Sequence, residues 1–271
     1  MRLRVVLLLV VGGLAAASCG SGESARSECE VLHEPGEYEE VGRYGDVDQP
    51  YWMVVPADYA NIAPAPLYVH LASGLGDHNG FMDGWRPYVD DLDGLMIVVN
   101  TATPSRIEPD ALASLVDEVS TEYCVDARRV HVLGTATSFG VAENFACEHS
   151  GRVASFVAAL GSAAGPCSPE RPVPLLTFSG DTDRDGVNHL VDKWININGC
   201  DPDPVVEDLG SGVMYKTYQN CAADVFFYDI EGMGHTYPLH EAKGSTPWVT
   251  EYDEVDYLEQ AQEFFAEHPL P

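Results

Sequence analysis

The chain has 271 residues, 45% of them hydrophobic, which is enough for one large domain with a full core. Its 43 acidic residues outnumber the 14 basic ones and give a formal net charge of -29 at pH 7. A chain with this much negative charge repels polyanions and anionic membrane surfaces. We therefore expect no nucleic acid partner.

The first 18 residues are typical of an export signal. Arg2 and Arg4 precede an apolar run at residues 5–11 that is too short to span a membrane. Small residues directly before Cys19 resemble a bacterial lipobox and predict cleavage and lipid attachment there, and an ordinary signal peptide is the alternative. We therefore expect a signal peptide at 1–18, a lipidated tether and N-terminal segment at 19–47, and the domain at 48–271. The protein would be exported, either as a cell envelope lipoprotein or secreted, and would contact a membrane only through its lipid anchor.

Apolar runs then alternate with amphipathic ones, which predicts an α/β fold with a mainly parallel sheet flanked by helices. No repeat or long linker interrupts this pattern, so it predicts one domain. The expected strands, in chain order, are Trp52–Val55, Leu67–Leu71, Leu95–Asn100, Val130–Leu133, Ser155–Leu160, Leu175–Ser179 and Val225–Ile230. The expected helices are Asp110–Tyr123, Phe139–Glu148, Val187–Asn196 and Val255–Glu267.

The turn at residues 134–138 has the frame of a hydrolase nucleophile elbow without the nucleophile. In the motif G-x-S-x-G, a sharp strand-to-helix turn lifts the serine side chain clear of the sheet. This chain reads G-T-A-T-S, so Ala136 stands in place of the serine and Ser138 in place of the second glycine. The most direct route to a covalent intermediate is therefore missing.

Segments on both sides of this turn resemble the secreted polyhydroxybutyrate depolymerase and feruloyl esterase family of α/β-hydrolases, over roughly residues 48–268. The resemblance implies an α/β-hydrolase fold, an ester or carbohydrate-like ligand, and a Ser, Asp and His triad that hydrolyses carboxylic esters. It maps the triad to Ala136, Asp183 and His235. The segments that carry it are Val125-Asp126, Arg129-Val130, Ala146-Cys147-Glu148, Asn198-Gly199-Cys200 and Gly234-His235-Thr236-Tyr237-Pro238.

The oxyanion region has also changed. Relatives carry a His-Gly turn after the first buried strand, and its loop supplies backbone N–H groups for the developing oxyanion. Here Ala72 and Ser73 occupy that turn, and Thr137 follows the elbow apex. The change removes a glycine that permits close backbone approach. Because Ser138 differs too, the pattern indicates natural divergence and not one deliberate replacement of the serine.

The cysteines predict about three disulfides. Apart from Cys19 there are six, an even number in an exported chain, where disulfides persist. A cysteine metal site is the alternative, but no C-x-x-C spacing supports it. The family resemblance implies the bridges Cys147–Cys167 and Cys200–Cys221, which leaves Cys29 to pair with Cys124.

Residues 181–186 match the first half of a calcium loop. Asp181, Asp183 and Asp185 alternate, Gly186 holds the sixth place, and Asp192 falls at the twelfth. Against calcium, the segment follows an expected strand instead of a helix, and the twelfth residue is not the usual Glu. No cofactor is required by the family chemistry, so calcium is the single cofactor hypothesis. An Asp183 that binds a metal could not also orient a catalytic histidine.

Three functional hypotheses follow. The favoured one is an exported α/β-hydrolase homologue that has lost serine esterase activity and acts by binding, so that restoring serine at 136 alone gives little activity. The second is an active carboxylic-ester hydrolase that uses Ser138 with His235 and Asp183, although helix capping competes for the Ser138 hydroxyl. The third is a calcium-binding structural module built on Asp181, Asp183 and Asp185.

Overall fold

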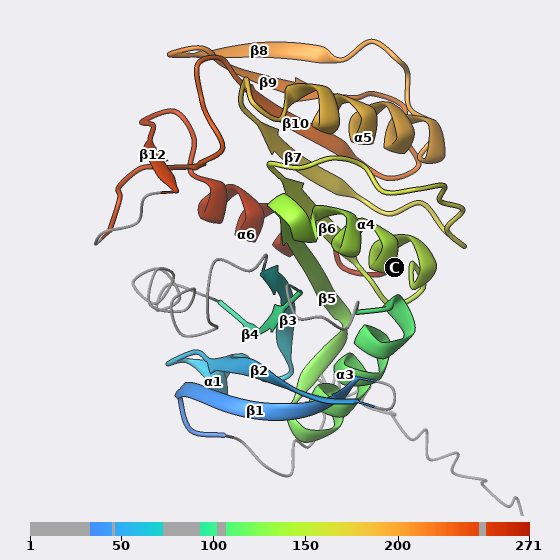
Figure 1. The fold of residues 1–271 in the computed structure, drawn as a ribbon, viewed down its shortest axis with the longest axis vertical. Coiled ribbons are helices and arrows are strands. Elements are labelled where there is room, and N and C mark those ends of the chain that lie inside the picture. Colours follow the sequence, from blue (N-terminus) through green and yellow to red (C-terminus); the bar gives the residue numbers. More distant parts are fainter. Residues whose placement is uncertain (1–32, 45–46, 73–92, 102–106, 244–247) are drawn as a thin grey trace, which may run out of the picture.

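The computed structural model describes residues 33–44, 47–72, 93–101, 107–243 and 248–271 (Figure 1). The expected signal peptide, Cys19, Cys29 and Ser73 lie outside this part of the chain, so the predictions for them stay predictions.

A ten-stranded sheet in the order β1-β2-β4-β3-β5-β6-β7-β10-β9-β8 forms the centre of the described structure (Figure 1). The six strands from β4 to β10 in this order run parallel to one another. At the two edges, the pairs β1–β2, β2–β4, β10–β9 and β9–β8 are antiparallel. The expected mainly parallel sheet is therefore confirmed. The strands are β1 Gly36–Tyr44, β2 Val47–Val55, β3 Ala65–Ala72, β4 Leu95–Asn100, β5 Val125–Thr135, β6 Ser155–Ala159, β7 Leu175–Ser179, β8 Val205–Gly210, β9 Val213–Thr217 and β10 Val225–Ile230, with β11 Tyr237–Leu239 and β12 Val249–Glu251 as a separate pair.

Helices cover both faces of the sheet. On one face Leu115 of α3, Phe145 of α4 and Trp194 of α5 join one buried apolar cluster. On the other face Phe264 and Phe265 of α6 join a second cluster. Burial on both sides explains why the central strands are nearly continuous apolar runs. The helices are α1 Tyr59–Ile62, α3 Pro109–Glu122, the short 3-10 turn η1 Ala136–Ser138, α4 Phe139–Glu148, α5 Arg184–Ile197 and α6 Tyr257–Glu267.

Strand β1 lies before the expected domain boundary. It pairs with β2 from Gly36↔Val55 to Tyr44↔Val47, so the boundary expected at residue 48 falls inside the sheet. Edge strands β1 and β8 were not predicted because neither alternates apolar and polar residues regularly, and β8 is exposed over most of its length. An exposed strand carries no apolar alternation that a sequence pattern could reveal.

Two of the expected disulfides are present. Cys147 at the end of α4 is bonded to Cys167, and Cys200 after α5 is bonded to Cys221. Cys124 is disulfide-bonded as well, and its expected partner Cys29 lies outside the described residues. Within the described ranges, none of the helices combines the length and apolar character needed to cross a membrane.

Candidate functional site

The backbone of the nucleophile elbow is intact although its serine is absent. Ala136 has φ 51°, a left-handed conformation that costs energy for a residue with a side chain. A Cβ atom added to Gly134 would lie 2.3 Å from the Cβ of Ala142 and 2.9 Å from the carbonyl oxygen of Ser138. Glycine therefore lets α4 pack directly against the end of β5. The chain keeps the strained turn that usually presents a nucleophile.

Ser138 holds this turn from inside the protein. Its side chain is fully buried, and its hydroxyl accepts a hydrogen bond from the Thr135 N–H at 2.9 Å. Its proton goes to the carbonyl oxygen of Leu71 or to that of Thr135, which lies 2.7 Å away. The hydroxyl does not cap α4 itself; it forms the capping box of the short turn η1 with Thr135, and its partners lie on β3 and β5. This burial does not favour Ser138 as a displaced nucleophile, which stays a hypothesis.

Ala72 lies beside the elbow at the end of β3. Leu71 is paired with Gly134 in the register of β3 and β5, and the carbonyl of Ala72 accepts hydrogen bonds from the N–H and the hydroxyl of Thr101, both at 2.9 Å. Thr137 is exposed just past the apex. The hydroxyl of Ser138 therefore joins the elbow to the strand end from which the oxyanion loop starts.

The structure brings the expected acid and base together. The Nδ1 atom of His235 lies 3.0 and 2.9 Å from the two carboxylate oxygens of Asp183. Because a carboxylate accepts, this contact places the proton on Nδ1 and leaves Nε2 as the basic nitrogen. The side chain of Asp183 is 12% exposed and that of His235 is 48% exposed. The histidine can therefore reach a ligand from solvent while its partner is shielded.

A buried tyrosine connects the histidine loop to the elbow. The hydroxyl of Tyr237 donates to the Thr135 hydroxyl at 2.6 Å, and Thr135 directly precedes Ala136. The Thr135 hydroxyl also accepts the N–H of Ser138. Burial raises the pKa of Tyr237 to about 12, so its phenol stays a donor at neutral pH. The loop that carries His235 is thus fixed relative to the apex.

Arg184 fixes the loop that carries Asp183. Its guanidinium contacts Asp181 at 2.9 Å and Asp229 of β10 at 2.8 Å, and Lys216 contacts Asp229 at 2.7 Å. Burial alone would raise the pKa of Asp229, but hydrogen bonds from Lys216 and Arg184 outweigh it and lower that pKa. Sequence reasoning missed this network, because β9 and β10 supply two of its members.

The calcium motif does not form a loop in this structure. Helix α5 begins at Arg184, the fourth position of the motif, so Asp185 and Asp192 are both helical. Gly186 has another explanation: its added Cβ would lie 2.4 Å from the carbonyl oxygen of Gly161. Among the described residues no group of three or more His, Cys, Asp or Glu side chains could hold a metal. Calcium binding stays an untested prediction that this geometry does not favour.

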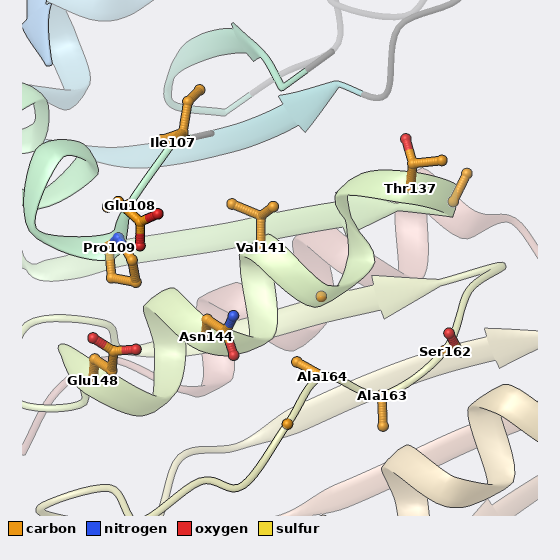
Figure 2. A pocket seen from close by; sticks show the side chains of 13 residues that line it. Ile107, Glu108, Pro109, Thr137, Val141, Asn144, Glu148, Ser162, Ala163 and Ala164 are labelled. Carbon is orange, nitrogen blue, oxygen red and sulfur yellow. The ribbon is translucent and has the colours of Figure 1, made fainter. Parts of the chain in front are cut away.

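A groove of about 460 Å³ leads away from the elbow along α4. Figure 2 shows Thr137 at one end, Glu108 and Glu148 at the other, and Val141 and Asn144 of α4 between them. The groove combines a small apolar floor with a few polar groups, as ligand sites do. Its lining residues are Ile107, Glu108, Pro109, Ala136, Thr137, Gly140, Val141, Asn144, Glu148, Ser162, Ala163, Ala164 and Gly165.

One wall of the groove, residues 162–165, is held by the buried carboxylate of Glu143. This side chain has no exposed surface and accepts from the N–H of Ala164, from the Trp194 indole N–H at 3.0 Å and from Lys193 at 2.7 Å. The ammonium of Lys193 also donates to the carbonyl of Gly165 at 2.5 Å. Sequence reasoning missed Glu143, although an acidic residue within an apolar helix was a usable signal.

Comparisons with known proteins agree with this architecture, although no family model matches the chain. The chain is 24% identical to feruloyl esterase B of Piromyces equi over a 239-residue alignment that covers 71% of this chain and 43% of that protein. It therefore spans less than half the length of this relative.

Solved structures of esterases share the fold. Acetyl xylan esterase from Aspergillus awamori superposes with a TM-score of 0.61 at 13% identity, covering 85% of this chain and 99% of that one. A mutant of the feruloyl esterase module from Clostridium thermocellum, complexed with sinapinate, superposes with a TM-score of 0.53 at 8% identity, covering 74% and 82%. The chain therefore has the α/β-hydrolase fold and is similar in sequence to a feruloyl esterase.

Proposed function

We propose that the protein binds an ester through its elbow and the adjoining groove, and that it has lost serine esterase catalysis. The observation that carries this proposal is an elbow-like turn with a methyl group at its apex: Ala136 has φ 51°, while the nearby Ser138 hydroxyl is buried and hydrogen-bonded. Removing the triad serine of a serine protease lowers kcat on the order of a millionfold. The retained turn, groove and His235 then serve recognition.

The ligand class comes from the relatives. The solved feruloyl esterase module holds sinapinate, so a methyl ester of a hydroxycinnamic acid is a reasonable probe for this chain. Its aromatic ring would lie against apolar side chains such as Val141 in the groove, with the ester group near Thr137. Because hydrogen bonds to Glu143 and Lys193 already hold residues 162–165 in place, binding loses little conformational entropy in this segment.

The first experiment measures hydrolysis of a nitrophenyl acetate ester. We compare the wild type with His235→Ala, Ala136→Ser, and the Ala136→Ser/Ser138→Gly pair that restores the full motif. The wild type is expected to hydrolyse the ester no faster than His235→Ala, and Ala136→Ser alone is expected to add little because the oxyanion turn has also changed. Wild-type turnover that disappears in His235→Ala would overturn the loss of catalysis.

A second experiment measures binding of methyl sinapinate by protein fluorescence. Ala164→Trp, at a methyl group that faces Gly140 of α4, narrows the groove and is expected to weaken binding at least tenfold, whereas Ala266→Trp, which places the same side chain on the exposed surface of α6, is expected to leave it unchanged. Equal affinities in the two variants would place the ligand elsewhere.

Hydrolysis with another nucleophile is the second candidate function. The hydrogen bond between Asp183 and His235 favours it, because this pair is the base that would activate a hydroxyl or a water molecule. The hydroxyl of Thr137 is exposed beside the apex, whereas that of Ser138 is not. Covalent trapping with a fluorophosphonate, followed by peptide mass spectrometry, would identify a residue that reacts.

We also propose that the protein is exported and anchored through Cys19. The N-terminal pattern supports this, and two disulfides are typical of proteins in oxidising compartments. Metabolic labelling with a fatty acid is expected to mark the wild type and not Cys19→Ala. Labelling of neither would leave a secreted protein without an anchor.

A further inference from the structure

A second hollow lies on the face of the sheet opposite the groove, between α6 and strands β9 and β10. Its volume is about 90 Å³, and its apolar members belong to the cluster beneath α6, whereas α4 packs on the other face. Nothing in the proposed function uses this hollow. Its lining residues are Leu176, Tyr215, Phe226, Tyr228, Gln260, Glu263, Phe264 and Glu267.

Four of the eight lining side chains are aromatic. Tyr215 stacks on Tyr228 with ring centroids 4.5 Å apart, and Phe226 meets Tyr215 and Phe264 edge to face at 5.9 and 5.8 Å. Tyr215 and Phe226 are only partly buried, so part of their ring surface faces the hollow and solvent. The negative potential of such rings attracts cations.

The rim of the hollow is acidic. Glu263 and Glu267 are exposed on α6, and none of the eight lining residues is basic. Burial raises the pKa of Tyr215 to about 12, and the nearby carboxylates of Glu267, Asp224 and Glu207 add to this shift.

Two nitrogen-bearing side chains near this face already have partners. The imidazole of His268 packs on the ring of Phe264, with centroids 4.2 Å apart, and contacts Asp224 at 3.0 Å and the carbonyl oxygen of Phe264 at 2.6 Å. The ammonium of Lys216 lies over the ring of Phe227, 4.8 Å from its centroid, and Phe227 belongs to the cluster on the opposite face. The described side chains therefore place negative charge around the aromatic rings without a compensating cation in the hollow itself.

We propose that this hollow binds a small quaternary ammonium cation, such as the trimethylammonium group of choline. A primary ammonium needs three hydrogen-bond acceptors, whereas half of the lining side chains are aromatic and the side-chain oxygen of Gln260 already accepts from the Tyr228 hydroxyl. A quaternary ammonium has no N–H group to satisfy and is held by ring faces and nearby carboxylates. The small volume admits one such group and excludes a larger ring system.

The test titrates the full chain with choline and with 3,3-dimethylbutanol, its uncharged isostere, and follows the ligand methyl protons by NMR. Choline is expected to bind with a Kd on the order of 1 mM and to show an upfield ring-current shift at saturation. The isostere is expected to bind at least tenfold more weakly. Tyr215→Leu is expected to remove most of the shift.

Charge variants separate this site from diffuse attraction to an acidic protein. Glu263→Gln/Glu267→Gln changes two exposed side chains and is expected to weaken choline binding by about threefold to tenfold. Glu34→Gln/Glu39→Gln makes the same change in net charge near β1, at the far edge of the sheet, and is expected to have no effect. Equal weakening by both pairs, equal affinity for the isostere, or no saturable shift below about 20 mM would each overturn the proposal.

Discussion

Replacing Glu143 with leucine is expected to destabilise the protein by about 3–5 kcal/mol, the range found when one partner of a buried ion pair is removed. Glu143 has no exposed surface, and its carboxylate holds the wall of the groove to α4 and α5. Leucine has a similar volume, so packing loss is small and the cost comes from the polar groups left behind.

The magnitude follows from the three donors that would lose their acceptor. The indole N–H of Trp194 is buried and cannot turn to water, and the N–H of Ala164 is partly covered. Each costs about 1–3 kcal/mol when left unsatisfied. Lys193, whose side chain is 19% exposed, can reach solvent and adds less. Glu143→Gln retains one acceptor oxygen and is expected to cost about half as much.

Urea unfolding followed by tryptophan fluorescence at pH 7, with the disulfides intact, measures these differences. With a slope of about 2–3 kcal/mol per molar urea, the midpoint of Glu143→Leu should fall by about 1–2 M. A matched surface variant, Glu259→Leu on the exposed side of α6, should change the free energy of unfolding by less than about 0.5 kcal/mol. A cost below about 1 kcal/mol for Glu143→Leu would show that the donors find other partners, and would refute the argument.

Three further expectations concern pH, the elbow and calcium. Burial lowers the pKa of His131 from 6.5 to about 3, so below pH 6.5 the unfolded chain binds a proton that the folded chain does not. The free energy of unfolding should therefore fall by about 1.4 kcal/mol per pH unit until that low pKa is reached. Urea titrations of His131→Leu should show a dependence on pH that is smaller by this amount, whereas parallel profiles of the two proteins would contradict the expectation. Gly134→Ala should destabilise by about 1–3 kcal/mol because its Cβ would meet Ala142, whereas Gly165→Ala, with no atom within 4 Å of the added Cβ, should leave the melting temperature unchanged; equal melting temperatures would contradict the close packing. Calcium and chelator should give the same melting temperature, since Asp183 already accepts from a histidine; a rise of several degrees with calcium would restore the calcium hypothesis.

Patterns along the chain were sufficient to predict the central strands, the main helices and the frame of the elbow. These features are local: buried parallel strands are apolar runs, amphipathic helices repeat with the helical period, and a G-x-x-x-S turn joins one to the other. Family resemblance added the pairing of Cys147 with Cys167 and pointed to Asp183 and His235, which are 52 residues apart in the chain. Such distant contacts leave no periodic signal along the sequence.

The contacts between these local features depend on how distant segments pack together. The sequence predicted that Ser138 would cap the following helix, but its hydroxyl bonds to Thr135 and Leu71 because β3 lies beside β5 in the sheet. The second part of the calcium pattern lies in helix α5, and its Gly186 permits the close approach of the backbone at Gly161. Glu143 supports the groove wall because Trp194 and Lys193 of the neighbouring helix α5 bind the same carboxylate as the N–H of Ala164. Hydrogen bonds between segments distant in sequence depend on how the chain is folded, so the residue types alone could not assign them.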